Sequence, residues 1–278
     1  MSTLAHALAH AQTLGLPRTE AGMLLLHVLE RPLHERAWLV AHDSDTLPPD
    51  LSARFEALLS RRMNGEPIAY LTGCKPFYGL DLAVDARVLD PRDDTETLVD
   101  WALDLCSPAT RSVPWRLLDL GTGSGAIALA LRSQRPSADV TAVDRSEEAL
   151  AVATANARQL NLPLRLLAGD WFAPVQDERF DLIVSNPPYI AESDPHLPAL
   201  VHEPRAALVS GPDGLADIRH LIAHAPAHLL PGGWLLLEHG WDQAEAVRAL
   251  LAAAGFEQVQ SKHDLAGIER CSGGRLAG

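Results

Sequence analysis

A glycine-rich loop and a later aspartate are the first residues in the sequence that can bind a ligand. Gly121-Thr122-Gly123-Ser124-Gly125 follows the apolar run Leu117–Leu120 and precedes the helix-like segment Ala126–Ala130. Glycines at a strand end let the backbone approach a ligand closely and adopt positive φ angles. Asp144 ends the next apolar run, where its carboxylate can accept hydrogen bonds from both hydroxyls of a ribose. Together they predict an adenosine-containing cofactor, either a nicotinamide nucleotide or S-adenosylmethionine.

The glycine spacing excludes two other phosphate-binding loops. Gly-x-Gly-x-Gly differs from the Gly-x-Gly-x-x-Gly fingerprint of dinucleotide-binding domains, and no Gly-Lys-Ser or Gly-Lys-Thr follows as in a P-loop. The alternative is a turn that serves only helix–strand packing, with Asp144 as a solvated acid. The position of Asp144 at a strand end favours the ligand site.

A second chemical feature is the sequence Asn186-Pro187-Pro188-Tyr189, which directly follows the apolar run Asp181–Ser185. The prolines fix their φ angles and remove two backbone donors, so the turn offers carbonyl acceptors and one side-chain amide. Asn186 Oδ1 and the Pro187 carbonyl can each accept one hydrogen of a planar –NH2 group, and Tyr189 can form a flat wall beside it. We therefore expect the turn to bind an amide or an exocyclic amine, rather than to be purely structural.

The elements that must position these residues follow from the hydrophobic pattern. From Trp115 onward, apolar runs alternate with helix-length segments such as Ala126–Gln134 and Glu147–Leu160. This alternation predicts an α/β fold, a parallel sheet with helices on both faces. The expected strands are Leu117–Leu120, Val140–Val143, Leu164–Leu167, Leu182–Val184 and Leu235–Leu237, with edge strands at Phe256–Gln260 and Ile268–Cys271.

A small helical domain and a hairpin are expected before this sheet. Residues 1–74 show helical periodicity in four short segments, one opened by Thr19-Glu20 and one capped by Asp50 after Pro48-Pro49. Aromatic residues beside turn formers between Ile68 and Leu82 predict the β-hairpin. The predicted organisation is a helical domain over 1–74, a β-hairpin linker over 75–90 and an α/β domain over 91–278.

Composition narrows the possible functions. The formal net charge of −13 disfavours a generic nucleic-acid coat. Three scattered cysteines are too few for a disulfide framework or a zinc site, and the twelve histidines are expected to be solvent-facing or packed rather than metal ligands. No apolar run approaches the roughly 18 residues of a membrane span, and the start does not resemble a signal peptide. We expect a cytoplasmic protein with no metal, no membrane contact and no direct nucleic-acid partner.

The glycine loop combined with Asn-Pro-Pro-Tyr resembles the S-adenosylmethionine-dependent amino-methyltransferases. The rest of the chain narrows this resemblance to the peptide chain release factor glutamine N5-methyltransferases. The matching segments, which cover nearly the whole chain, are Gly65–Gly73, Pro91–Glu96, Asp170–Phe172, Asp194–Leu197, Glu203-Pro204 and Leu235–Gly240.

The resemblance implies a seven-stranded, Rossmann-like class I methyltransferase domain behind a helical substrate-docking domain and a hairpin linker. It implies S-adenosylmethionine as cofactor and, as substrate, the glutamine of the Gly-Gly-Gln motif in class 1 release factors. By this resemblance, the loop Gly121, Thr122, Gly123, Ser124 and Gly125 would line the methionine part of the cofactor, Asp144 would hold the ribose, and Asp170 and Trp171 would lie beside the adenine. Asn186, Pro187, Pro188 and Tyr189 would hold the glutamine amide, with Asn186, Pro187 and Tyr189 catalytic and Asn186 also next to the cofactor.

Two departures from the family pattern and three alternatives stay open. Asp90 and Asp93 stand where the family usually has an apolar residue and a proline, and Ser272–Gly278 lacks the usual aromatic finish.

The alternatives are glutamine methylation of a ribosomal protein, adenine N6-methylation of nucleic acid, and a silent cofactor-binding module. The acidic net charge argues against the second, and intact Asn186 and Asp144 argue against the third.

Overall fold

The chain is divided into two compact units. The computed structural model describes residues 2–107 and 113–278, and the boundary between the units lies between Cys74 and Lys75 in the chain. In the described part of the chain, no helix is both long enough and apolar enough to cross a membrane.

The first unit consists of short helices around an apolar core. Leu24, Leu25, Leu26 and Phe55 are fully buried in it. The Thr3 side chain caps the first helix by accepting a hydrogen bond from the amide of His6. The helices are α1 (Leu4–Thr13), α2 (Arg18–Val28), α3 (Arg36–Ala41), α4 (Pro49–Met63) and α5 (Ile68–Thr72).

The structure corrects the predicted helix starts in this unit. Helix α2 begins at Arg18 after Pro17, so Thr19-Glu20 does not open it, and α4 begins with Pro49, so Asp50 lies in its first turn and is not the cap. A proline has its φ angle already fixed near the helical value and lacks only an amide that a first turn leaves unpaired. Pro17, at the N-cap of α2, and Pro49, at the first position of α4, therefore mark the two helix starts in place of Thr19-Glu20 and Asp50.

The predicted hairpin is present, but it begins later than its aromatic residues suggested. Strands β1 (Cys74–Phe77) and β2 (Leu80–Ala83) pair across Tyr78 and Gly79, which both have positive φ angles of 49° and 75°. Two such residues make the tight turn that matches strand twist. Ile68 and Tyr70, expected in the hairpin, lie instead in the short helix α5.

The second unit contains a seven-stranded sheet in the order β5-β4-β3-β6-β7-β9-β8. The first five strands in this order are parallel, whereas β9 is antiparallel to both β7 and β8. The predicted fold class is therefore confirmed. The strands are β3 (Arg116–Leu120), β4 (Asp139–Asp144), β5 (Arg165–Ala168), β6 (Phe180–Ser185), β7 (Leu229–Glu238), β8 (Phe256–His263) and β9 (Glu269–Leu276).

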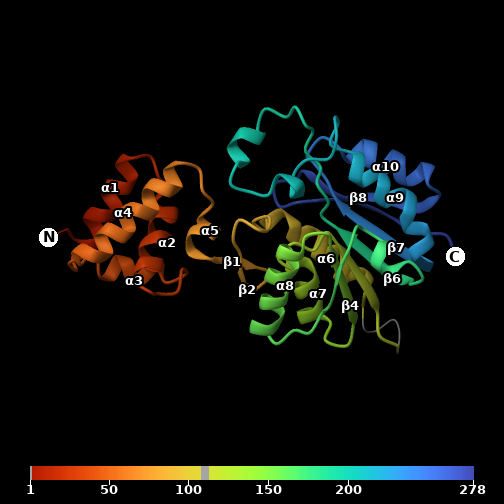
Figure 1. Ribbon diagram of the computed structural model, residues 1–278, viewed down its shortest axis with the longest axis horizontal. Coiled ribbons are helices and arrows are strands. Elements are labelled where there is room, and N and C mark those ends of the chain that lie inside the picture. Colours follow the sequence, from red (N-terminus) through yellow and green to blue (C-terminus); the bar gives the residue numbers. More distant parts are fainter. Residues whose placement is uncertain (1, 108–112) are drawn as a thin grey trace. The chain divides into compact units, whose positions relative to one another are not determined.

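Helices cover both faces of this sheet, as its nearly continuous apolar strands require. Helices α6, α7 and α8 lie on one face, and α9 and α10 lie together on the other (Figure 1). Strand β3 has β4 on one side and β6 on the other, so the strand order reverses there, which is where open α/β sheets bind ligands. The helices are α6 (Glu96–Leu105), α7 (Ala126–Gln134), α8 (Glu147–Gln159), α9 (Ala216–His228) and α10 (Ala244–Ala253).

The last strand continues further than the sequence predicted. Strand β9 runs to Leu276, although Gly273 and Gly274 lie inside it. A Cβ atom on Gly273 would come within 2.5 Å of Leu236 Cδ2 and 2.9 Å of Trp101. The glycines lower strand propensity, yet the close packing here requires them.

Candidate active site

The glycine loop turns sharply at the end of β3. Gly121, Gly123 and Gly125 all have positive φ angles, of 72°, 55° and 83°. The amides of Gly121 and Thr122 both donate to the carbonyl of Val143, at 2.9 and 3.0 Å, so the loop is fixed to the end of β4. A Cβ on Gly123 would meet nothing within 4 Å. The loop therefore exposes its backbone to open space at this point, as the sequence predicts for a close approach to a ligand.

Asp144 is the last residue of β4 and fixes the same loop from the other side. Its Oδ2 accepts a hydrogen bond from the amide of Gly123 at 2.8 Å, and its Oδ1 accepts one from the amide of Ser146 at 2.9 Å. Each carboxylate oxygen has a second lone pair for a further donor. Asp144 can thus hold the loop and a ligand hydroxyl together.

A buried carboxyl supports the loop from below. Asp119, fully buried in β3, accepts a hydrogen bond from the Thr122 hydroxyl at 2.7 Å. Burial raises the pKa of Asp119 to about 7, and the nearby Asp144 charge adds to the increase. The Thr122 hydroxyl therefore donates its hydrogen to Asp119, within the protein.

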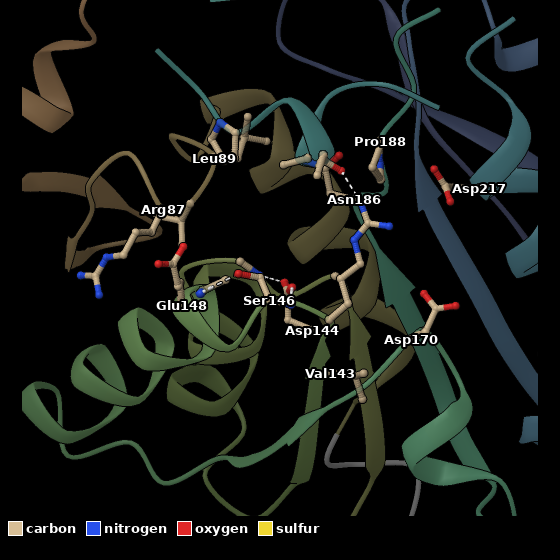
Figure 2. Close-up of a pocket in the computed structure, with 18 of the residues that line it drawn as sticks. Arg87, Leu89, Val143, Asp144, Ser146, Glu148, Asp170, Asn186, Pro188 and Asp217 are labelled. Carbon is tan, nitrogen blue, oxygen red and sulfur yellow. Dashed lines mark hydrogen bonds between the residues drawn. The ribbon is translucent and has the colours of Figure 1, made fainter. Parts of the chain in front are cut away.

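The loop and Asp144 border a cavity of about 310 Å³, within the usual range for a small-molecule site (Figure 2). The segments that form its wall come from the ends of several parallel strands and from the loops between them. Predicted site residues that line it are Gly121, Gly123, Asp144, Asp170, Trp171, Asn186 and Pro188. Those that do not are Thr122, Ser124, Gly125, Pro187 and Tyr189.

The residues outside the cavity wall have structural partners of their own. Gly125 precedes α7 and packs closely, because a Cβ there would lie 3.2 Å from Leu129 and 3.3 Å from Ala153. The Ser124 carbonyl accepts a hydrogen bond from the side-chain Nδ2 of Asn156 at 2.9 Å. Direct contact of Thr122, Ser124 and Gly125 with a cofactor stays a prediction.

The Asn-Pro-Pro-Tyr turn begins where β6 ends, beside the glycine loop. The Ser185 hydroxyl donates to the Leu120 carbonyl at 2.6 Å, which joins the ends of β6 and β3. The Tyr189 amide donates to Leu208, and the Tyr189 carbonyl accepts from Gln243 at 3.0 Å. The turn is therefore held at both ends.

A group of polar side chains lies behind this turn. Asn186 Nδ2 donates to the hydroxyl of Thr95 at 3.3 Å, and the Tyr189 hydroxyl donates to Glu238 Oε1 at 3.4 Å. Burial raises the pKa of Glu238 to about 7 and, together with the Glu238 charge, raises that of Tyr189. Asn186 and Tyr189 were predicted from the sequence to lie in the site. Thr95 was not predicted, and its only sequence signal is its position beside Glu96 in the Pro91–Glu96 segment.

Two cavity walls were also missed by the sequence analysis. One is the segment 86–89 after the hairpin, and the other is the loop that carries Pro204, Ala206 and Ala207. Arg92 donates to both carboxylate oxygens of Glu203, at 2.6 and 2.8 Å, and so connects the two loop regions. Asp90 lies 3.3 Å from Arg92, and Asp93 pairs with Lys75 at 2.9 Å, so both unusual acids are ion-paired.

Among residues 2–107 and 113–278, no group of three or more His, Cys, Asp or Glu side chains is placed to hold a metal ion. His220 and His224 instead stack on each other, and His228 stacks on Phe172 with ring centroids 4.5 Å apart.

Family models and solved structures that are similar to this chain indicate its class of protein. Residues 105–259 match the family model of the methyltransferase small domain, and residues 2–73 match that of the PrmC N-terminal domain. A methyltransferase from Pyrococcus furiosus superposes with a TM-score of 0.56 at 21% identity, covering 78% of this chain and 97% of that one. The RsmC 16S rRNA methyltransferase of T. thermophilus gives a TM-score of 0.53 at 20% identity, covering 73% of this chain and 49% of that one. The fold and the site define a methyltransferase.

Relatives with higher identity define the family. The release factor glutamine methyltransferase of Bordetella pertussis is 54% identical, over 94% of this chain and 96% of that protein. The protein of the same name from Escherichia coli is 44% identical, over 98% of this chain and 97% of its own. The chain belongs to the release factor glutamine methyltransferase family.

Proposed function

We propose that this protein transfers a methyl group from S-adenosylmethionine to the side-chain nitrogen N5 of the glutamine in the Gly-Gly-Gln motif of class 1 release factors. The observation that carries the proposal is the position of Asn186 at the wall of the cavity beside the glycine loop. An amide-binding turn and a nucleoside-sized cavity meet there. Family membership supports release factors over a ribosomal protein or adenine as the substrate.

The residues around the cavity fit the proposed cofactor. Gly121 and Gly123 leave room for backbone contact with its methionine part, and Asp144 has lone pairs free for the ribose hydroxyls. Trp171 lines the same cavity and offers an apolar ring for the adenine, beside Asp170. When bound, S-adenosylmethionine supplies an electrophilic methyl group.

The turn would bind the glutamine amide through acceptors. Asn186 Oδ1 and the Pro187 carbonyl would each accept one hydrogen of the substrate –NH2, which leaves its nitrogen facing the cofactor cavity. An amide nitrogen is a weak nucleophile, so positioning has to supply most of the rate, up to roughly 7–11 kcal/mol. Acceptors on the –NH2 group would also stabilise the charge that develops on it, and the proton would leave to water.

The same acceptors would reject glutamate. A carboxylate has no hydrogen for Asn186 Oδ1, and polar mismatches of this kind discriminate by about 10⁴–10⁵-fold. The first unit, which matches the PrmC N-terminal domain, is the candidate for docking the release factor. A release factor substrate would place the reaction in the cytoplasm.

The proposal is tested by methyl transfer to defined substrates. The purified protein is incubated with labelled S-adenosylmethionine and a release factor, the same factor with Gln→Glu in the Gly-Gly-Gln motif, ribosomal proteins, or DNA. Mass spectrometry then maps the modified residue. We expect label only at the glutamine of the unmodified factor. Label confined to ribosomal protein or DNA, or no transfer at all, would overturn the proposal.

A further inference from the structure

Thr95 lies between Asn186, at the cavity wall, and a buried carboxyl, Glu238. Its hydroxyl accepts a hydrogen bond from Asn186 Nδ2 at 3.3 Å. A side-chain hydrogen bond with Thr95 also lowers the pKa of Glu238 against the effect of burial, and an ionised Glu238 requires Thr95 to be the donor. Thr95 is 3% exposed and Glu238 is 1% exposed, so water does not compete at this place. Glu238 Oε2 has no close hydrogen-bond partner among the described residues, which leaves the carboxyl with acceptor capacity for this hydroxyl.

The direction of these hydrogen bonds has a chemical consequence. A hydroxyl has one hydrogen, and Glu238 can only accept once it is ionised, above its pKa of about 7. When the Thr95 hydrogen points to Glu238, Thr95 offers Asn186 only lone pairs. The –NH2 end of the Asn186 side chain must then face Thr95, and its Oδ1 must face the other way.

We propose that Thr95 and Glu238 are positioning residues that fix the orientation of the Asn186 side-chain amide, so that the site presents an acceptor and selects a glutamine amide over a carboxylate. This inference rests on the proposed function and explains how that site distinguishes its substrate. Reversal of the Asn186 amide would present –NH2 to the substrate, and glutamate would then be the better match.

The surrounding contacts hold Thr95 and Glu238 in place. The Thr95 amide donates to the Arg92 carbonyl at 3.1 Å, and the adjacent Glu96 carboxylate accepts from the amide of Tyr78 at 2.7 Å. Glu238 also accepts from the Tyr189 hydroxyl. One carboxyl therefore contacts the far end of the Asn-Pro-Pro-Tyr turn directly and its first residue through Thr95.

The test compares Thr95→Val, which keeps the shape but loses the hydroxyl, with Thr95→Ser, which keeps the hydroxyl. For each we measure, above pH 7 where Glu238 is ionised, kcat and KM with the release factor, cofactor affinity by calorimetry, and inhibition by the Gln→Glu release factor. We expect Thr95→Val to lower kcat about 10- to 100-fold, the range of a lost charge-assisted hydrogen bond. Cofactor affinity should change little, and the Gln→Glu factor should inhibit at least about 10-fold better relative to the KM for the natural factor.

Two further variants separate positioning from packing. In Glu238→Gln the new –NH2 group can donate to Thr95, which frees the hydroxyl hydrogen to turn toward Asn186, so we expect the same gain of inhibition. Thr122→Val is the matched control, because it removes another hydroxyl bonded to a buried carboxyl, that of Asp119. It should lower stability or cofactor affinity and leave the discrimination between glutamine and glutamate unchanged.

The possible failures are distinguishable. If the wild-type protein methylates glutamine but Thr95→Val and Glu238→Gln keep both its kcat and its discrimination, the inference is overturned. It is also overturned if Thr95→Ser behaves like Thr95→Val, or if Thr122→Val shifts discrimination equally. If the wild-type protein transfers no methyl group to glutamine, the proposed function itself fails. Thermal melting and cofactor affinity identify a variant that is merely unfolded. If Thr95→Val is unfolded, the result for Glu238→Gln tests the inference in its place.

Discussion

The two units of the chain bury different kinds of side chain. In the described residues of the first unit, Thr72 is the one buried polar side chain, and the core is otherwise Leu, Ala, Val and Phe. The second unit buries polar groups beside an equally apolar core. Its buried carboxyls are Asp119, Asp181, Glu203, Glu238 and Asp264.

This difference separates side chains that stabilise the fold from buried carboxyls that lie beside the proposed site. Burial of a carboxyl costs free energy unless hydrogen bonds or charges compensate it. In the second unit, Asp119 lies under the glycine loop and Glu238 lies behind the Asn-Pro-Pro-Tyr turn. The carboxyls with strongly raised pKa values thus lie next to the proposed cofactor and substrate sites, which is typical of functional sites.

The largest expected effect on stability concerns the apolar unit. Phe55 is fully buried in the first unit, and Phe55→Ala should lower the free energy of unfolding by about 3–5 kcal/mol through lost burial and a cavity. Urea unfolding measures this loss. Cofactor affinity, measured by calorimetry where the variant is folded, should stay within about twofold. A large loss of cofactor affinity in the folded variant would contradict the separation between the two units.

A change of similar size in the free energy of unfolding, but one that depends on pH, is expected at Glu238. Its pKa is raised from 4.5 to about 7, and the charged or titratable groups that face it are Tyr189, Arg270, Asp94 and Cys271. Between these two pH values the folded chain holds a proton that the unfolded chain has released. The stability from this proton is full below pH 4.5 and is lost as the pH rises through 7.

Glu238→Gln removes this dependence, because glutamine does not titrate. Relative to the wild type, the variant should gain about 3 kcal/mol in unfolding free energy as the pH rises from 4.5 to above 7. Urea unfolding of both proteins across this range gives the difference. A difference that does not vary with pH would show that Glu238 is ionised throughout and that its burial has no such cost.

The smallest expected effect lies at the surface of the first unit. Arg62 donates to Glu20 at 2.6 and 3.3 Å, and both side chains are 27% exposed. Partly solvated ion pairs contribute little to stability, so Arg62→Ala should lower the free energy of unfolding by about 1 kcal/mol or less. This loss should become smaller as the salt concentration rises. Thermal melting at low and high salt measures it. A loss as large as that of Phe55→Ala would mean that polar contacts, and not apolar burial, hold this unit together.

Local signals predicted the sheet and two of the residues that meet at the cavity. Asp144 and Asn186 stand at the ends of apolar runs, and parallel strands bring such ends to one edge, so their meeting at one cavity follows from the pattern. Helix α7 starts and ends as the periodicity predicts, because no proline or glycine competes inside it.

The features that were missed depend on distant packing. Gly273 and Gly274 argue locally against a strand. Only distant packing explains them, because a Cβ would meet Leu236 and Trp101 at Gly273 and Phe256 at Gly274. The cavity walls at 86–89 and 204–207 come from loops with no periodicity, connected through the Arg92–Glu203 pair. Thr95 has no sequence signal of its own, since its proposed role depends on residues about 90 and 140 positions further along the chain.

The most direct test of the central claim is the effect of Asn186→Ala on turnover compared with cofactor binding. Asn186 is proposed to hold the reacting amide, so its loss should lower kcat for the release factor by about 10²–10³-fold at saturating substrates. The Kd for S-adenosylmethionine, measured by calorimetry, should stay within about threefold of the wild-type value. Equal losses in kcat and cofactor affinity, or no loss of kcat, would contradict the claim that this turn presents an amide to the methyl donor.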